Sequence, residues 1–374
     1  MSPVRSKKSK ISADSLASRT SNGMSESITV AYHNPYPDTI YATRYVFIGF
    51  QNAFKQMGHK FVVFSPGQDL EEFLNEHKPQ LFITASHFFY RKFLDHELLK
   101  RWRQSRGLVL LSKIDFWDSP LNKNRINEAP SMKDDKEAKR LIKAGLLGDY
   151  YFHVAGQSDK RMDGFAKFAG QGYITIPLAA DPYSLKPIFT PKFKADISFI
   201  GTNLPQKRQY FKEWLFPLDD KYDLKLYGQD WTRRSRLLGY VTKGGQYFNL
   251  PVIKSLQKPP LKLGEEAKIY ASSKVLVNIH EDYQRRYGGD CNERTFKIPF
   301  CGGFEISDDV ACVRDYFVEG KELVIARSKE DWFDKIDYYF NHEAEAKKIA
   351  QAGRQKVLAA HTYEHRVLQM LDLL

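Results

Sequence analysis

The sequence predicts an α/β protein built from two Rossmann-like, parallel-sheet domains that face each other across a cleft. Three observations lead to this fold class. Short apolar stretches alternate with helical stretches along most of the chain, which implies right-handed strand–helix–strand crossovers. One proline-rich segment interrupts this alternation near the middle of the chain. The length of 374 residues is sufficient for two hydrophobic cores.

The first alternation occupies residues 27–177, which we interpret as one domain. It follows residues 1–26, a Ser- and Lys-rich tail with almost no large apolar side chains, which we expect to be disordered. The predicted strands cover residues 28–32, 60–64, 81–84, 108–111, 150–154 and 173–176. The predicted helices cover residues 41–57, 70–76, 93–103, 137–144 and 162–168, with Gly58 ending the first.

The second alternation follows a proline-rich hinge at residues 178–191 and covers residues 192–360. Its predicted strands are residues 196–200, 224–227, 274–279, 304–307 and 323–325. Its predicted helices are residues 207–216, 265–272, a short helix from about residue 292, 310–317, 329–340 and 343–359. Residues 231–260 are basic and irregular and predict no element, and residues 361–374 predict a separate helical segment.

Polar loops follow the predicted strands of the first domain, at residues 33–41, 85–90 and 113–133. Ligands of parallel sheets bind beyond the carboxyl ends of the strands, so these loops are the candidates for a site. The possible general bases in them are His33, His87, Asp115 and Asp118. Histidine suits that role because it titrates near neutral pH, although a single histidine at the start of a loop is more often part of the scaffold.

Net charge and cysteine content narrow the classes of partner. The formal charge is +12, of which residues 1–23 carry +4 and the rest of the chain +8. This favours anionic partners such as nucleotides, nucleic acids or acidic lipid headgroups. No zinc finger or RNA-binding signature supports nucleic acid, and the three cysteines have no metal or redox spacing. Without a secretory signal or a long apolar run, we expect a cytoplasmic protein.

One stretch, NIHEDYQRRYGGDCNERTFKIPFCGGFEISD at residues 278–308, predicts an anion site. A buried strand ends there, and a helix follows with Asn292 as its N-cap. Arg294 in the first turn, with Arg285 and Arg286 in the preceding loop, would add positive charge near a helix start. A solvated basic rim is the alternative. Asn278, Thr295 and Phe296 are further candidates for ligand contacts, although Phe296 fits a core position equally well.

A second candidate for phosphate binding is the turn after the first strand of the second domain. It combines Gly201 and Thr202 with Lys207 and Arg208 at the start of a helix. A tight turn with a solvated basic pair is the alternative. Tyr227 ends the neighbouring strand and is a further candidate for nucleotide contact. The sequence holds no Walker loop and no G-x-G-x-x-G, so no motif supports a kinase or a dehydrogenase.

Several segments in the same order resemble the CgeB-type (spore-maturation-protein-like) glycosyltransferases of the GT-B class, glycosyl transferases group 1. They are IPLAADPYSLKP at 176–187, DISFIGTNLPQKR at 196–208, LKLYGQDW at 224–231, SKVLVNIH at 273–280, NERTFKIPFCGGFEISD at 292–308 and AGRQKVLAAHTYEHR at 352–366, with a looser match at KIDFWDSP, 113–120. The resemblance covers mainly residues 177–370. Lys297 departs from it, because the family usually has there the Glu that in related enzymes holds the ribose of the nucleotide. The acidic residue eight positions earlier in retaining relatives is also absent, since Gly289 stands there.

The resemblance implies a glycosyltransferase that uses a nucleotide-sugar co-substrate, with the donor in the second domain and the acceptor in the first. It implies no bound metal and no other cofactor. The acceptor would be a glycan, a lipid-linked sugar or a protein, and the basic charge is compatible with peripheral contact with an anionic membrane. The exchange at Lys297 leaves a non-catalytic nucleotide- or glycan-binding module as the main alternative. A nucleic-acid-binding protein is the less favoured one.

Overall fold

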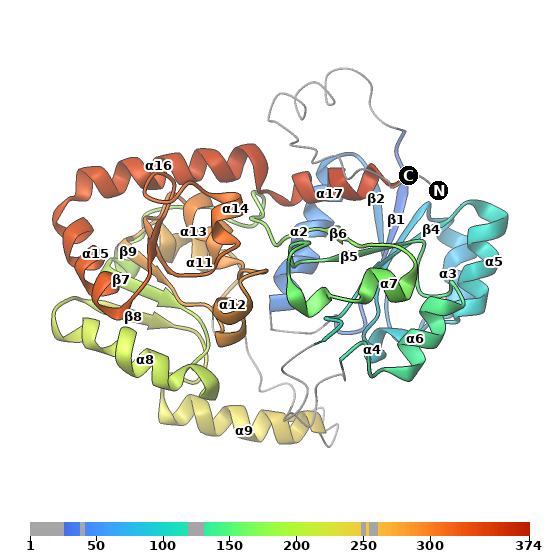
Figure 1. Cartoon of the computed structure of the whole chain (residues 1–374), viewed down its shortest axis with the longest axis horizontal. Helices are drawn as coiled ribbons and strands as arrows, with labels where there is room; N and C mark the ends of the chain where they lie inside the picture. The colour runs from blue at the N-terminus through green and yellow to red at the C-terminus, as the bar shows by residue number, and fades with distance from the viewer. Residues whose placement is uncertain (1–25, 38–41, 119–130, 248–251, 254–260) are drawn as a thin grey trace.

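The computed structural model describes residues 26–37, 42–118, 131–247, 252–253 and 261–374. Within them the chain forms two α/β domains side by side, each with a parallel sheet covered by helices (Figure 1). The predicted fold class is therefore confirmed. No helix of the described residues is long and apolar enough to cross a membrane.

The first sheet has the strand order β2-β1-β3-β4-β5-β6, and all of its recorded pairs are parallel. Its strands are β1 Thr29–His33, β2 Lys60–Phe64, β3 Leu81–Ala85, β4 Val109–Lys113, β5 Tyr150–His153 and β6 Ile174–Thr175. The connecting helices are α2 Ala42–Gln56, α3 Leu70–His77, α4 Phe88–Arg91, α5 His96–Arg106, α6 Lys136–Lys143 and α7 Phe165–Ala169. β3 is buried along its whole length, as expected of a central strand with helices on both faces.

Aspartate caps set the starts of helices in this domain. Asp95 accepts the N–H of Leu98 at 2.9 Å, so α5 begins three residues later than the sequence predicts. Asp69 and Asp135 cap α3 and α6 in the same way. The short helix α4, with His87 as its N-cap, was not predicted.

The second sheet has the order β11-β10-β9-β7-β8 and is also parallel. Its strands are β7 Ala195–Ile200, β8 Leu224–Tyr227, β9 Ser273–Asn278, β10 Glu305–Asp308 and β11 Val324–Ala326. Its helices are α8 Arg208–Trp214, α9 Arg233–Tyr247, α11 Glu265–Tyr270, α12 Asp282–Tyr287, α13 Arg294–Phe300, α14 Val313–Tyr316, α15 Lys329–Asn341 and α16 Glu343–Ala360.

Two helices of this domain occupy stretches for which the sequence predicted no element. α12 forms because Glu281 and Gln284 build a capping box around its first turn, a signal that the glycines following it obscured. α9 lies within residues 231–260, where basic residues hide the helical pattern. The predicted loops are therefore wrong at these two places.

The last helix, α17 Tyr363–Leu371, crosses back to the first domain and packs against α2 (Figure 1). The Tyr363 ring lies 5.0 Å from that of Phe50, and a Cβ on Gly49 would lie 2.3 Å from Tyr363. The hinge also contacts α17, because the carbonyl oxygen of Ala180 accepts a hydrogen bond from the N–H of Tyr363 at 3.1 Å. α17 is thus the separate helical segment that the sequence predicts, and the structure adds that its Tyr363, Val367 and Met370 belong to the first core.

Candidate active site

A cavity of about 290 Å³ lies at the carboxyl edge of the first sheet. Its walls come from the ends of β1, β3, β4 and β5, from α2, from the hinge and from Tyr363 of α17. His33, His87 and Asp115 all line it, so the structure brings together the three residues predicted to carry catalysis. The fourth, Asp118, is exposed and pairs with Lys133 at 2.7 Å.

His33 ends β1 and is fully buried. Its Nδ1 lies 3.0 Å from the Thr84 hydroxyl, and its buried Nε2 has no partner within the described chain. Burial lowers the pKa of His33 to about 3. The ring is therefore neutral at physiological pH and suits hydrogen bonding to a ligand hydroxyl better than accepting a proton.

His87 and Asp115 interact electrostatically across the cavity wall. The main-chain N–H of Phe89 donates to His87 Nδ1 at 3.4 Å, which places the ring proton of neutral His87 on Nε2. The Ser86 hydroxyl contacts Asp115 Oδ2 at 3.3 Å and accepts from the Asp115 N–H at 2.9 Å. Burial raises the pKa of Asp115, against the opposing effects of His87 and Lys113. Burial therefore favours the protonated form of Asp115 and the neutral form of His87.

Lys113 also lines the cavity, and the sequence analysis missed it. It is the last residue of β4, held between Ala85 of β3 and Phe152 of β5. The Lys113 side chain is exposed to solvent, yet the surrounding protein lowers the pKa of Lys113 by desolvation, while Asp115 and Asp290 counteract this. The sequence signal that could have identified it is a lysine at the end of a buried, mainly apolar strand.

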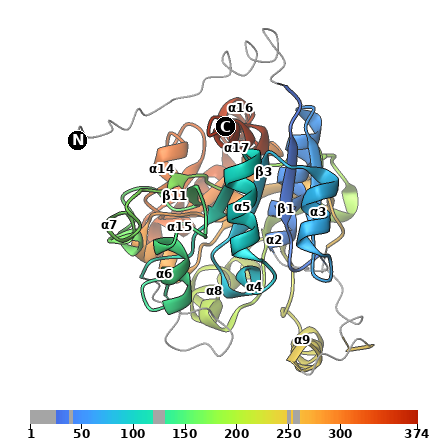
Figure 2. The ribbon, with the colours of Figure 1, turned by 90° about the vertical axis from the view of Figure 1, so that its right-hand side faces the viewer.

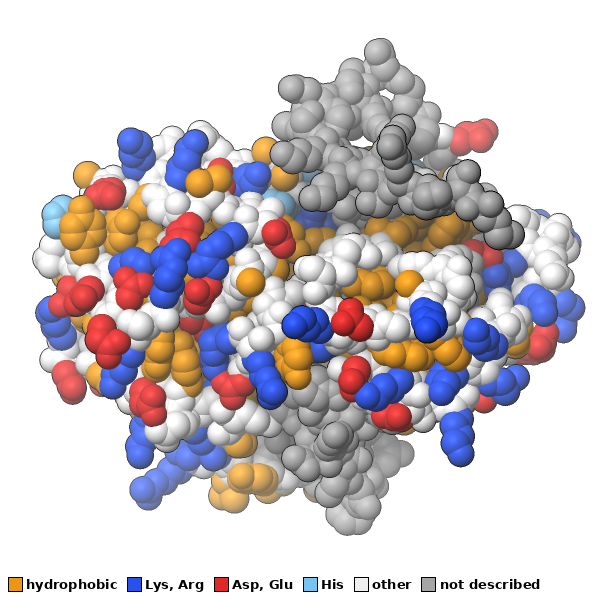
Figure 3. Space-filling model, in the orientation of Figure 1, with side chains coloured by type: hydrophobic (Ala, Val, Ile, Leu, Met, Phe, Trp, Pro, Cys, Tyr) orange, Lys and Arg blue, Asp and Glu red, His pale blue; other side chains and the backbone are white. Residues whose placement is uncertain are grey.

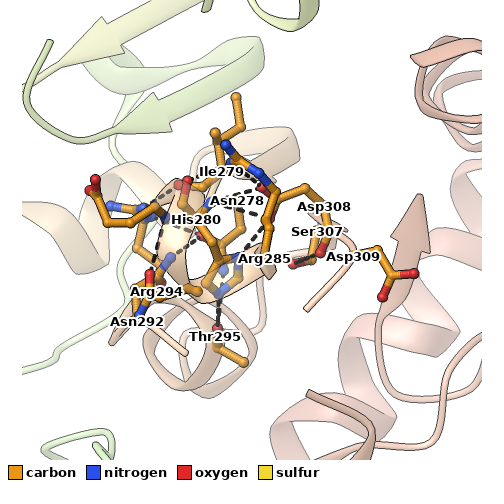
Figure 4. Close-up of polar contacts among 12 residues, drawn as sticks. Asn278, Ile279, His280, Arg285, Asn292, Arg294, Thr295, Ser307, Asp308 and Asp309 are labelled. Atoms are coloured by element: carbon orange, nitrogen blue, oxygen red, sulfur yellow. Dashed lines mark hydrogen bonds and ion pairs between the residues drawn. The ribbon is translucent and has the colours of Figure 1, made fainter. Parts of the chain in front are cut away.

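The carboxyl edge of the second sheet carries a buried polar network centred on Asn278 (Figure 4). Asn278 Nδ2 donates to Glu305 at 2.7 Å and to the Thr295 hydroxyl at 3.1 Å. Its Oδ1 accepts from Asn292 at 2.9 Å and from Arg294 Nε at 3.0 Å. Beside it His280 Nδ1 lies 2.6 Å from Asp308. Burial lowers the pKa of His280, and Asp308 opposes that shift.

Arg294 and Lys207, which the sequence predicts to contact the sugar donor, are paired with groups of the protein itself. Arg294 donates to the carbonyl oxygens of Ile200 at 3.0 Å and Ile279 at 2.8 Å. Lys207 donates to the Ile279 carbonyl at 3.0 Å and pairs with Glu281 at 2.9 Å. Burial lowers the pKa of Lys207 to about 8. These two side chains therefore connect strand ends with loops and stabilise the carboxyl edge of the second sheet.

Four other predictions in this region need correction. Asn292 does not cap a helix: α13 starts at Arg294 with Glu293 before it, and the Asn292 side chain turns toward Asn278. Thr295 is fully buried and bonds to Asn278 and His280. Phe296 is a core residue packed against Tyr316, as its alternative interpretation held. Arg285 likewise pairs with Asp308 at 3.0 Å.

Gly201, Thr202, Arg208 and Tyr227 lie around the turn after β7. The Gly201 N–H donates to the Tyr227 carbonyl at 2.8 Å, which closes this turn against β8. The turn leaves Gly201 and Thr202 half-buried. Arg208 is half-buried, and its buried Nε has no partner within the described chain. Of the predicted cations, Arg208 is therefore the one best placed to contact a ligand.

Lys297 is buried between two carboxylates. Its ammonium lies 3.1 Å from Glu266 and 3.0 Å from Glu293, and 4.0 Å from the centre of the Tyr45 ring of α2. Although burial alone would lower it, the two glutamates raise the pKa of Lys297. The exchange at this position therefore builds an ion cluster at the domain junction.

A second set of contacts joins the two domains at Arg161. Arg161 of the first domain pairs with Asp159 at 2.5 Å and also with Asp290 of the second domain. The N–H of Gly156 donates to the Gly289 carbonyl at 2.8 Å, and a Cβ on Gly289 would lie 2.1 Å from Asp159. Glycine at 289 thus permits close contact between the domains.

No group of three or more His, Cys, Asp or Glu side chains among the described residues could hold a metal ion.

Residues 208–372 match the family model described as glycosyl transferase-like. The spore protein CgeB of Bacillus subtilis (strain 168) is 20% identical to this chain over 210 residues. That match covers 52% of this chain and 59% of CgeB, so the chain spans about three fifths of the curated relative. With the fold, these similarities confirm the resemblance to CgeB-type proteins.

Solved structures share the architecture over nearly the whole chain. A sucrose-phosphate synthase from Thermosynechococcus elongatus has a TM-score of 0.58 at 12% identity, covering 92% of this chain and 98% of that one. An α-glucosyltransferase solved with UDP-glucose and abasic-site DNA has a TM-score of 0.61 at 10% identity, covering 93% and 99%. Anabaena HepE, solved with UDP and glucose, has a TM-score of 0.52 at 12% identity, covering 93% and 100%. At these identities the shared feature is the fold, which confirms the predicted GT-B architecture.

Proposed function

We propose that this chain, whose second half matches the glycosyl transferase-like family, transfers a sugar from a nucleotide-sugar donor to an acceptor hydroxyl. The observation that carries the proposal is the cavity at the edge of the first sheet, where His33, His87 and Asp115 meet opposite the donor domain. Ligands of parallel sheets bind at this edge, and a general base there would take the proton of an acceptor hydroxyl. The bound UDP and UDP-glucose of two similar structures support a uridine nucleotide as the first donor to test.

In the proposed reaction, an inverting transfer, the acceptor oxygen bonds to the anomeric carbon while the bond from that carbon to the diphosphate breaks, and the nucleoside diphosphate leaves with the electron pair. Asp115 accepts the proton of the attacking hydroxyl. Burial raises its pKa toward neutrality, which makes the carboxylate a better proton acceptor than an exposed one. Neutral His87 donates a hydrogen bond through Nε2, and His33 accepts one through Nε2 from a hydroxyl of the substrate. Lys113 would stabilise negative charge that develops in the cleft.

On the donor side we propose that Arg208 and the Gly201–Thr202 turn contact the diphosphate. Arg294, Lys207 and Asn278 act as positioning residues, because their bonds to strand ends keep that surface in place. Because Lys297 is paired with two glutamates, groups other than residue 297 would bind the ribose of the nucleotide. The resemblance further implies that turnover needs no divalent cation, which activity in EDTA tests.

The acceptor belongs to one of three classes: a glycan, a lipid-linked sugar or a protein. Aromatic side chains of the cavity, including Tyr32, Phe47, Tyr90 and Tyr363, offer ring faces and edges to an acceptor. Donor hydrolysis and transfer to representatives of each class would separate the three.

The first experiment is a thermal-shift panel with UDP, GDP, CMP, TDP and their sugar conjugates. A ligand present at about 100 times its Kd should stabilise the protein by about 2.7 kcal/mol. Arg208→Ala should remove the shift, whereas Arg140→Ala, which changes an exposed arginine paired only with Glu137, should keep it. A shift with no sugar transfer or donor hydrolysis would favour the non-catalytic module.

Catalysis is tested by Asp115→Asn. It should reduce kcat by about 10²–10⁴-fold while the melting temperature and the donor-induced shift remain. Asp118→Asn, three residues away but exposed, is the matched control and should keep full activity. Equal activity of the two variants would refute the assigned base. Binding to DNA or RNA that weakens steeply with salt would instead support the nucleic-acid alternative.

A further inference from the structure

Helix α9 stands away from the second domain (Figures 1 and 2). Its large side chains are turned outward: Leu237 is 67% exposed and Tyr240 is 65% exposed. Leu238 and Val241 are each 45% exposed. At about 100° per residue these four side chains span an arc of roughly 160° on one side of the helix. Gly239 lies on the opposite side, where a Cβ would come 3.1 Å from Asp230.

The same helix carries a high positive charge. Arg233 and Arg234 are exposed in its first turn, and Arg236 is half-buried one turn from Tyr240. Residues 231–264 hold seven Lys or Arg and no Asp or Glu. This stretch and residues 1–23 together account for +11 of the net +12, so the charge outside the tail is concentrated here. The space-filling view shows orange apolar side chains beside blue cationic ones at the lower edge of the molecule (Figure 3).

The root of the helix is fixed to the donor domain. Trp231 donates through Nε1 to the Gly201 carbonyl at 2.8 Å, and its ring packs on Phe211 at 5.2 Å. α9 is therefore anchored at the turn that we propose for the donor diphosphate. Leu237, Tyr240 and Val241 present apolar surface to water, which costs free energy unless something covers it.

We propose that α9 is a docking element for an anionic membrane surface. Arginines near an apolar arc are the pattern of helices that lie in the headgroup region, with aliphatic side chains in the acyl boundary and cations at the phosphates. The site consists of Arg233, Arg234, Leu237, Tyr240 and Val241. It goes beyond glycosyl transfer and does not depend on it, because membrane binding needs no catalysis.

Two other occupants fit the observations less well. Nucleic acid would match the arginines, but aliphatic Leu237 and Val241 find no apolar partner on a phosphate backbone. A second copy of the chain could cover the apolar arc, but it would bring the same basic surface to the contact, and residues 231–264 hold no Asp or Glu to pair with it. Both are outcomes of the test below.

The test is co-sedimentation of the full chain with phosphatidylcholine vesicles, with and without about 30% phosphatidylglycerol. The protein should bind the anionic vesicles and be released by salt. The pair Arg233→Gln and Arg234→Gln should weaken binding by about fivefold for each arginine. The pair Leu237→Asp and Val241→Asp should weaken it at least tenfold.

Matched controls lie on α16. Leu358→Asp changes a leucine that is 45% exposed, and the pair Lys347→Gln and Lys348→Gln removes two exposed charges. Both should bind vesicles like the natural protein. If an α9 aspartate variant folds poorly, the arginine pair still decides, because it leaves the apolar residues in place.

The proposal is overturned if the natural protein ignores anionic vesicles, or if the α9 variants bind them unchanged. It is also overturned if those variants bind vesicles normally while they lose nucleic-acid binding, or if light scattering shows that they only dissociate a dimer.

Discussion

The buried cluster around Lys297 makes a strong prediction about charge reversal. Lys297, Glu266 and Glu293 are only 6%, 10% and 11% exposed at their side chains. Lys297→Glu would replace two attractions with two repulsions in a place that water hardly reaches. The same change also removes the contact with Tyr45 of the first domain.

The size of the effect follows from the distances. Unit charges about 3 Å apart interact by roughly 5 kcal/mol at an effective dielectric constant of about 20. Protonation limits the loss, because burial already raises the pKa of Glu293 and a third carboxyl would raise it further. We therefore expect a loss of about 3–5 kcal/mol, typical of breaking a buried ion pair. That is a large share of the 5–15 kcal/mol that stabilises most proteins.

Urea unfolding followed by circular dichroism measures this loss. With a slope of about 3 kcal/mol per molar, the midpoint should fall by about 1–1.7 M. Lys348→Glu reverses an exposed lysine on α16 and should leave the midpoint unchanged. The triple variant with Gln at 266 and 293 and Met at 297 should be close to the natural protein, since it removes all three charges together.

A midpoint of Lys297→Glu equal to that of the natural protein would refute the buried cluster. Loss of activity in this variant does not report on ribose binding, because the domain junction is damaged at the same time. Restoring the residue of the relatives would need its two glutamate partners to change as well.

Glu305→Gln should remove a pH dependence of stability. Burial raises the pKa of Glu305 from 4.5 to about 8, so its contribution is present below pH 4.5 and lost as the pH rises through 8. The free energy of unfolding of the natural protein should fall by roughly 3–5 kcal/mol over that range, and urea titrations of the glutamine variant should lack this fall. Arg161→Met should leave Asp159 and Asp290 without their counter-charge and should enlarge the radius of gyration in small-angle scattering; an unchanged radius would argue against a role in domain closure. Arg208→Ala should raise KM for the nucleotide sugar about 10–100-fold with kcat nearly unchanged, and an unchanged KM would remove Arg208 from the donor site.

The local features of the fold could be predicted well because they depend on near neighbours. The alternation of apolar strands and helices is repeated in both sheets, and β8 has the predicted bounds, residues 224–227. Misplaced boundaries have local causes as well: α5 starts where Asp95 can cap it. α12 was missed because its capping box at Glu281 precedes a glycine-containing stretch that is typical of a loop.

The candidate site was predicted unevenly for a physical reason. Residues that follow strands of one parallel sheet must meet at one edge, so His33, His87 and Asp115 could be placed together from the sequence. Whether each arginine or lysine side chain is paired within the protein could not be predicted, because its partners lie far along the chain. Arg294 bonds the carbonyl of Ile200, 94 positions away, and this leaves Arg208 as the better candidate for ligand contact.

The sequence by itself determined two parallel sheets, their order along the chain and the loops at their carboxyl edges, since periodicity, glycines and caps act over a few residues. Only the tertiary structure decided that α17 completes the first core, that Lys297 lies between Glu266 and Glu293, and that Arg161 reaches Asp290 across the domain junction. These contacts join segments distant in sequence, and burial decides their energy. The sequence does not show whether a basic residue is solvated, lies in a buried ion cluster or is exposed on a helix such as α9. Its tertiary surroundings decide this.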